Sequence, residues 1–176
     1  YRAVATNTVG SATSDAAVLT VNTVPTITTQ PLFQTVAAGA SVTFTVAASG
    51  SPAPTYRWQV STNGGTTFTD LTDGVPYSGA TTAILTITGA TVGLTGNQYR
   101  AVATNIAGSA TSNHATLTVT SAPAILTHPA NQVVPIGANT SFTALASGSP
   151  LPTYQWQVSI ASGPFTNLTE TAPYSG

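Results

Sequence analysis

The chain has 176 residues, and only 4% of them are charged: three arginines, no lysine and four acidic residues. An average domain carries about 25% charged residues, and a phosphate-binding face needs clustered Lys and Arg, so this composition excludes a nucleic-acid-binding protein. Hydrophobic residues make up 41% of the chain and recur periodically, which argues against disorder. No apolar run approaches the roughly 18 residues of a membrane span.

The chain contains no cysteine. A small domain without disulfides either folds in the cytosol or is an extracellular domain that does not need them. The Thr-rich surface without lysine offers few sites for trypsin-like cleavage, which favours an extracellular or cell-surface location.

The first segment of the chain returns later almost unchanged. Residues 1–21 match residues 99–119 at 16 of 21 positions. Residues 48–61, which contain Trp58, return as residues 146–159 at the same offset of 98. Self-similarity at a fixed offset is the mark of a repeat architecture.

A repeat of about 98 residues has the size of an ordinary domain. We therefore expect residues 1–22 to be the last strands of a preceding domain, residues 23–121 a complete domain, and residues 122–176 the first strands of a following one. The chain would then be a window on a longer tandem array. An alternative is strand complementation, in which the tail of one molecule pairs with the head of another. It is the weaker alternative because the tail has no counterpart of residues 80–89.

The junctions between repeats are short. Only three residues separate Val119 from Pro123, and the equivalent Val21 and Pro25 are as close. Proline fixes its own φ and restricts the residue before it, so consecutive domains should keep a preferred angle. A strand of about 12 residues spans roughly 40 Å, which predicts the length that each domain adds to a rod.

Within the complete unit, apolar and polar residues alternate over residues 42–48, 56–60, 83–88 and 99–104. This is the period of half-buried strands, and about seven to nine such strands predict a two-sheet sandwich. Asn63 and Gly64 predict a tight hairpin in which both residues have positive φ. The side chains expected in the core are Trp58, Val46, Ala101, Tyr99, Phe44, Leu85, Ile87, Leu117 and, in the next copy, Trp156.

The spacing of three groups of residues resembles that of an immunoglobulin I-set domain. The groups are Gly39, Val42, Phe44 and Val46; Pro52, Pro54 and Trp58; and Gly96, Tyr99, Ala101, Ala103, Asn105 and Gly108. The spacing is similar in particular to that of the Ig-like repeats of large secreted bacterial surface proteins. The resemblance implies an all-β, immunoglobulin-like β-sandwich.

The same resemblance assigns roles to particular positions. Val46 and Ala101 stand where related domains carry a cysteine bridge, so apolar packing must replace it. Tyr99 is expected to hydrogen-bond nearby backbone as a tyrosine corner. Leu94 stands close to where the family places an acidic residue, and it is expected to plug the bottom of the core.

Few residues in the sequence could take part in catalysis or bind a metal ion. His114 and His128 have no acidic partners nearby in the sequence, and Ala16 and Gln30 replace them in the other copy. Asp70 and Asp73 flank a turn and are expected to cap it. We therefore expect no catalytic residue, no metal site, no cofactor and no enzymatic activity.

A possible binding face comprises Arg57, Arg100, Phe68 and Tyr77. The two arginines should project from neighbouring strands of one sheet, either into solvent or toward a partner. Phe68, like its counterpart Phe165, either anchors a sheet edge or contacts a partner. Tyr77 lies in a Pro-Tyr-Ser-Gly loop that returns at residues 173–176.

Two functions remain. The first is a structural or adhesive extracellular module, one repeat of a stiff rod or fibre on a bacterial surface, with neighbouring copies as partners and self-association into fibres as a further possibility. The second is a carbohydrate- or surface-binding accessory module of a secreted multidomain protein, with a surface glycan as partner. Neither involves nucleic acid or a membrane span.

Overall fold

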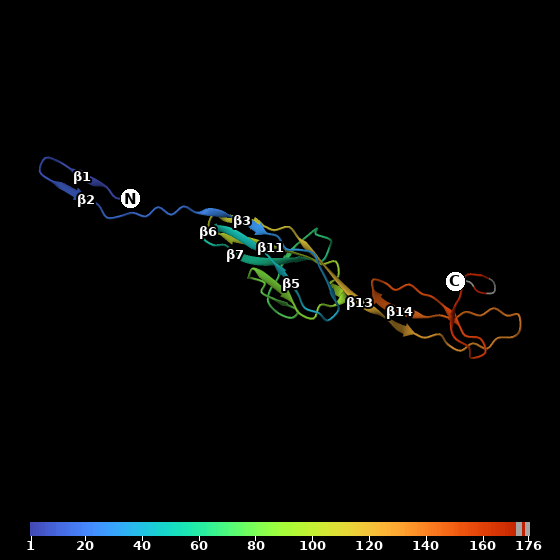
Figure 1. Cartoon of the computed structure of the whole chain (residues 1–176). Coiled ribbons are helices and arrows are strands. Elements are labelled where there is room, and N and C mark those ends of the chain that lie inside the picture. The colour runs from blue at the N-terminus through green and yellow to red at the C-terminus, as the bar shows by residue number, and fades with distance from the viewer. Residues whose placement is uncertain (172–173, 175–176) are drawn as a thin grey trace. The chain divides into compact units, whose positions relative to one another are not determined.

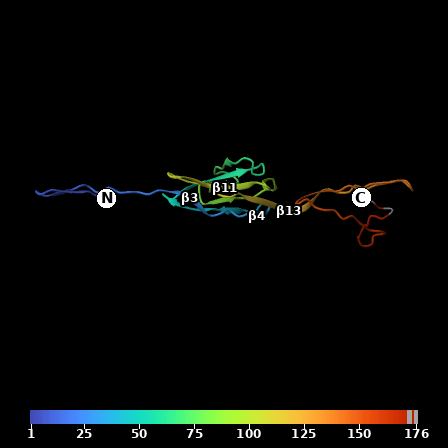
Figure 2. The ribbon, with the colours of Figure 1, turned by 90° about the horizontal axis from the view of Figure 1, so that it is seen from above.

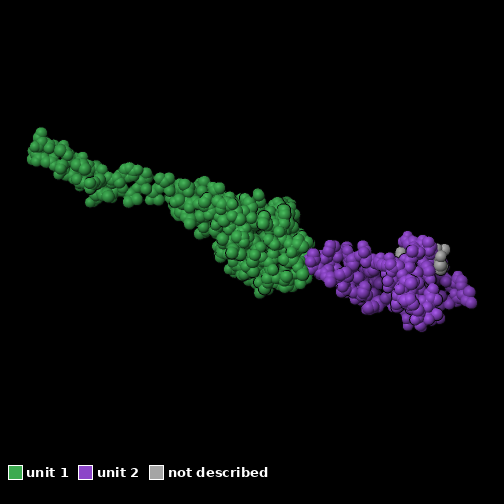
Figure 3. Space-filling model, viewed as in Figure 1, with its two compact units in different colours: residues 1–119 green, residues 120–176 purple. Residues whose placement is uncertain are grey.

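The computed structural model describes residues 1–171 and residue 174. Most of the predicted second Pro-Tyr-Ser-Gly loop, at residues 173–176, therefore lies outside the described residues. The chain divides into two compact units, residues 1–119 and residues 120–176 (Figure 3). Apart from one short 3-10 helix, η1 (Val92–Leu94), the regular structure of the described residues is entirely β.

The chain begins with a small hairpin of β1 (Val4–Thr6) and β2 (Ser11–Thr13), coloured dark blue in Figure 1. Every residue from 1 to 24 is exposed. Tyr1 is 82% exposed, whereas Tyr99, which occupies the same place in the matching segment, is fully buried. The same residues are therefore buried only where a complete sandwich surrounds them.

The first layer of the sandwich consists of two hydrogen-bonded groups of strands, formed by β3 (Thr23–Thr29), β5 (Val42–Thr45), β6 (Ala47–Ser51), β9 (Tyr77–Ser78) and β10 (Ile84–Ile87). The strand order is β5-β10-β9, and β3 pairs with β6. Only one residue separates β5 from β6, so the two form one interrupted strand. Pairing is antiparallel throughout, with Leu85 opposite Phe44.

The second sheet has β7 and β11 at its centre (Figure 1). Its strands are β4 (Gln34–Ala37), β7 (Thr55–Ser61), β8 (Thr69–Asp70), β11 (Gln98–Asn105), β12 (Gly108–Thr111) and β13 (Ala115–Thr127). The order is β8-β7-β11-β13, with β12 also on β11 and β4 on β13. Figure 2 shows β11, β4 and β13 within this unit from above.

The two sheets enclose an apolar core. Trp58, Phe44, Leu85 and Tyr99 are fully buried, and the ring of Phe44 lies 5.0 Å from that of Tyr99 and 6.4 Å from that of Trp58, measured between centroids. The indole nitrogen of Trp58 donates a hydrogen bond of 2.9 Å to the carbonyl of Thr82. The buried indole N–H of Trp58 therefore has a hydrogen-bond partner. The aromatic rings of the core pack against one another and against Leu85.

The remaining predicted core positions of this unit are buried as well: Val46, Ala101, Ile87 and Leu117. Ala101 lies opposite Trp58 in the β7–β11 register. Leu94, on η1, is half-buried and packs against this core. Apolar side chains therefore fill the places where related domains carry a covalent bridge.

The predicted tight hairpin at Asn63 and Gly64 is wrong. Positive φ falls on Gly64 (68°) and Gly65 (89°), and the loop between β7 and β8 spans residues 62–68. The side-chain oxygen of Asn63 accepts hydrogen bonds from the Ser61 hydroxyl and the Thr67 amide. This side-chain bonding stabilises a longer loop than the two-residue turn would form.

The second unit repeats local details of the first. Part of β13 pairs with β14 (Leu145–Ser149), and β15 (Gln157–Val158) pairs with β16 (Thr166–Asn167). The hydroxyl of Tyr154 accepts a hydrogen bond from the Ala146 amide at 2.8 Å, as that of Tyr56 does from Ala48 at 3.0 Å. Trp156, expected in a core, is only partly buried. Two strands that cover Trp58 in the first unit, β10 and β11, have no counterpart among the described residues of the second.

Candidate functional site

The outer surface of the β8-β7-β11 sheet gathers most of the polar chemistry of the complete unit. Since Trp58 and Ala101 point inward, their neighbours Gln59 and Arg100 point outward, because successive side chains of a strand alternate between faces. The antiparallel register places Arg100 opposite Gln59, and Gln59 opposite Asp70.

These side chains form a connected network. Gln59 Nε2 donates to Asp70 Oδ1 at 2.7 Å, and Arg100 Nε donates to Gln59 Oε1 at 2.8 Å. The Arg100 guanidinium carbon lies 3.9 Å from the centroid of the Phe68 ring, and the ring of His114 lies 6.4 Å from that of Phe68. A guanidinium at this distance is attracted by the aromatic ring. We call these five residues the Arg100 face.

Arg57 lies on the same side of the sheet but has a separate partner. Its Nη1 donates to the carbonyl of Leu71 at 3.2 Å, and the residue is half-buried. Gln155, its counterpart in the second unit, donates likewise to the carbonyl of Leu168 at 2.9 Å. Arg57 and Arg100 thus both project outward from neighbouring strands, and each is half-buried and hydrogen-bonded rather than free in solvent.

Tyr77 does not join this face. It lies on β9 of the other sheet, is half-buried and packs against the core. Its hydroxyl lies 3.4 Å from that of Tyr99, and the ring centroids are 6.2 Å apart. Burial, with a contribution from this hydrogen bond, raises the pKa of Tyr99 well above its ordinary value. The partner of the Tyr99 hydroxyl is thus a side chain, whereas the sequence predicted backbone.

The remaining titratable residues are dispersed. In the part of the chain that the structure describes, neither Asp70 nor Asp73 bonds the backbone of its own turn: Asp70 accepts from the Gln59 side chain, and Asp73 Oδ1 accepts a hydrogen bond of 2.8 Å from the Ala80 amide, seven residues further along the chain. His128 is exposed. Within residues 1–171 and 174, no three His, Cys, Asp or Glu side chains come together in a group that could hold a metal ion. No helix in this part of the chain has the length and hydropathy of a membrane span.

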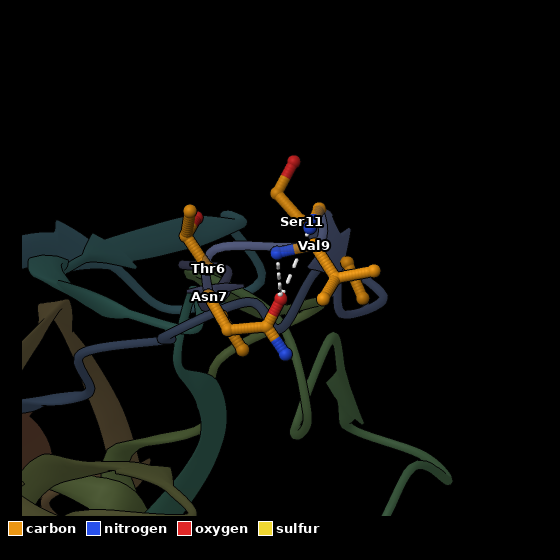
Figure 4. A pocket seen from close by; sticks show the side chains of 7 residues that line it. Thr6, Asn7, Val9 and Ser11 are labelled. Carbon is orange, nitrogen blue, oxygen red and sulfur yellow. Dashed lines mark hydrogen bonds between the residues drawn. The ribbon is translucent and has the colours of Figure 1, made fainter.

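A shallow hollow lies at the tip of the β1–β2 hairpin, lined by residues 5–7 and 9–12 (Figure 4). All of these residues are exposed. Its hydrogen bonds run from the amides of Val9 and Gly10 to Asn7 Oδ1, at 2.8 and 3.0 Å. This is the geometry of an Asx turn, and it gives the hollow no chemistry of its own.

Comparison with known proteins decides the fold. Residues 24–105 match a family model described as an immunoglobulin domain. The solved N-terminal four Ig domains of Dscam1 isoform 4.44 superpose with a TM-score of 0.62, at 22% identity, over 84% of this chain and 38% of that one. The fold is an immunoglobulin-like β-sandwich.

Two curated relatives illustrate where such Ig-like sequences occur. Endoglucanase C of Cellulomonas fimi is 44% identical over 144 residues, which cover 81% of this chain and 12% of that protein. Human leucine-rich repeats and immunoglobulin-like domains protein 3 is 35% identical over 156 residues, which cover 89% of this chain and 14% of that protein. The chain thus spans about an eighth of the length of these relatives. An Ig-like domain in such proteins is consistent with a structural or accessory module.

Three members of the Arg100 face were not among the residues predicted for binding: Gln59, Asp70 and His114. Gln59 could have been found, since alternation around Trp58 places it on the side of Arg57. The contact of His114 with Phe68 joins segments 46 residues apart, and no local pattern predicts it.

Proposed function

We propose that this chain is a structural module of an extracellular bacterial protein, a spacer within a tandem array of Ig-like domains. The observation that carries the proposal is the close agreement between the sequence offset of 98 and the extent of the folded sandwich, which runs from Thr23 in β3 to Val119 in β13. Relatives named for their immunoglobulin-like domains, and a bacterial endoglucanase with similar sequence, support it.

The two ends of the sandwich are fastened by side chains, as a spacer that holds its neighbours in a fixed direction requires. At the entry, Asn105 Nδ2 donates to the carbonyls of Thr23 and Pro52 at 2.8 and 2.9 Å. At the exit, the Thr95 hydroxyl donates to the Val119 carbonyl at 3.1 Å and accepts from the Val119 amide at 3.0 Å. These bonds restrict motion of the backbone where it enters and leaves the domain.

The segment after the exit supports stiffness as well. Strand β13 runs from Ala115 to Thr127, and its pairing with β14 has an irregular register between Ser121 and Ala124. Pro123 lies within this strand, where a flexible linker would instead be rich in Gly and Ser. We infer that consecutive domains keep a preferred angle and distance.

Distance measurements between spin labels test this proposal. The chain has no native cysteine, so Ala53→Cys and Leu151→Cys label two equivalent positions specifically. Pulsed electron–electron double resonance between the two labels should give a narrow distance distribution, centred on the roughly 40 Å expected for one repeat. Insertion of four glycines after Ser121 is the matched control and should broaden it. A distribution as broad without the insertion as with it overturns the spacer role.

A second function is favoured by the Arg100 face: an accessory module that binds carbohydrate or another surface component. Arg100 and Phe68 recur as Arg2 and Phe165 at the equivalent positions of the other copies. The 44% identity with an endoglucanase fits such a role. Retention of the chain on a panel of immobilised polysaccharides tests it, and absence of binding to every member of the panel would contradict it.

A further inference from the structure

We propose that the Arg100 face binds a polysaccharide that carries carboxylates, with the Arg100 guanidinium as the group that receives the uronate carboxylate. This inference rests on the accessory-module function and does not depend on the spacer role. It specifies the ligand class and the residue.

The guanidinium of Arg100 is held in place before any ligand arrives. Nε is bonded to Gln59, which is itself held by Asp70, and the guanidinium group lies against the Phe68 ring. Within the described residues, the two Nη groups of Arg100 make no hydrogen bond or ion pair. An arginine fixed in this way presents two parallel N–H donors, the arrangement that a carboxylate accepts in bidentate fashion. Little side-chain entropy remains to be lost on binding.

The charge of the face suits an anion. Arg57 and Arg100 both lie on this side of the sheet, and the carboxylate of Asp70 is engaged by Gln59 Nε2. The complete unit has only one other charged residue, Asp73, whose carboxylate accepts a hydrogen bond from the Ala80 amide. With Arg57, Arg100 and Asp70 on this side of the sheet, the face carries a formal charge of +1, and the carboxylate of Asp70 is turned to Gln59 rather than to Arg100.

The face fits a sugar better than a peptide. The backbone of β7 is already paired on both sides, with β11 and with β8, so a peptide strand could add only beside β8, two strands away from Arg100 on β11. Recognition falls to side chains: a guanidinium, an amide, an aromatic ring and the exposed imidazole of His114. Planar polar groups can bond to sugar hydroxyls, and the apolar face of a sugar ring can cover an aromatic edge. A uronic acid joins such a ring to a carboxylate in one residue.

Comparison of the copies within the chain singles out the same pair. Gln155 replaces Arg57 and Ala16 replaces His114, but Arg2 and Phe165 preserve the arginine and the phenylalanine. The frame beneath also recurs, since Gln157 Nε2 donates to Asn167 Oδ1 at 2.9 Å. Arg2 belongs to the copy before the complete unit and Phe165 to the copy after it, so an array whose repeats carry both residues would bind a polymer of uronates at several repeats at once.

The test is binding of the 176-residue chain to polygalacturonate, measured by biolayer interferometry at low salt. Fully methyl-esterified polygalacturonate is the neutral probe, and poly-glutamate supplies carboxylates without sugar rings. Arg100→Gln should weaken binding to polygalacturonate at least about tenfold, the loss expected for hydrogen bonds to a charged group. Arg57→Gln is the matched control, because it removes one charge from the same side of the sheet and, as in Gln155, keeps the bond to the backbone. It should change affinity less than about threefold.

The outcomes separate this inference from the function on which it rests. Selective binding to polygalacturonate that Arg100→Gln weakens and Arg57→Gln spares supports the proposal, provided that both variants melt at the temperature of the parent chain. Equal losses in the two variants, or equal binding of poly-glutamate, overturn it. Binding to neutral polysaccharides alone overturns the carboxylate assignment and preserves the accessory role. No binding to any polysaccharide overturns both and leaves the spacer role intact.

Discussion

Leu85 and Ile84 are adjacent on β10 but face opposite sides of the sheet. Leu85 is fully buried opposite Phe44, whereas Ile84 is 48% exposed. Leu85→Ala removes three buried carbons, which is worth about 2.5 kcal/mol of transfer free energy. The cavity left among aromatic neighbours adds to this, so the free energy of unfolding should fall by about 2.7–5 kcal/mol.

Urea unfolding followed by circular dichroism measures this loss, with Ile84→Ala as the control on the same strand. The control should cost less than about 1 kcal/mol, since its side chain is half in water and mainly its strand propensity changes. A domain of this size has about 5–15 kcal/mol of stability, so both variants should remain folded enough for measurement. Equal losses in the two variants would refute the assignment of Leu85 to a packed core.

Three further predictions concern hydrogen bonds and pH. Trp58→Phe removes the indole bond to the Thr82 carbonyl and part of the core volume, and should lower the free energy of unfolding by about 2–4 kcal/mol in the same urea assay. Asn105→Ala breaks two hydrogen bonds to backbone carbonyls and should lower the free energy of unfolding by about 1–2 kcal/mol. Asn7→Ala, in the exposed hairpin, is the control and should leave the unfolding of the sandwich unchanged. Equal effects of the two substitutions would contradict the anchoring role of Asn105. Burial raises the pKa of the Tyr99 hydroxyl above its ordinary value of 10.0, so the unfolded chain loses this proton at a lower pH than the folded chain. The free energy of unfolding should therefore fall as the pH rises above about 10. In a pH series of thermal melts, Tyr99→Phe should flatten that dependence.

The sequence predicted those parts of the fold that depend on alternation. The period-2 patterns around Phe44, Trp58, Leu85 and Tyr99 placed each of these side chains inside, because an antiparallel sandwich with one wet face imposes that pattern on its strands. The resemblance to the immunoglobulin family implied in addition that Val46 and Ala101 replace the usual cysteine bridge, and both side chains are buried.

The parts that the sequence did not predict depend on which segments meet. The sequence placed Tyr77 in a loop and on the possible binding face, but the return of the chain through β9 brings its hydroxyl to 3.4 Å from that of Tyr99. Asn63 looked like a two-residue turn, but its side chain bonds to Ser61 and Thr67 and holds a longer loop. Such contacts join residues through side-chain geometry, which neither periodicity nor turn propensity encodes.

The same limit applies to the candidate site. Arg100 and Phe68 were both singled out, yet nothing local indicates that the guanidinium lies against the ring or that Gln59 holds it. The register of β7 against β11 creates that arrangement. Residues of this kind are predicted individually from the sequence and as a group only from the fold.

The account depends most on the packing of Trp58 without any covalent bridge. In a Trp156→Phe variant, Trp58 is the sole indole, so its fluorescence reports the core of the complete unit alone. We predict blue-shifted emission that acrylamide does not quench in the native state, and a single cooperative shift to exposed emission in urea that is unaffected by reducing agent. Emission typical of an exposed indole in the absence of urea, with ready quenching, would contradict the account.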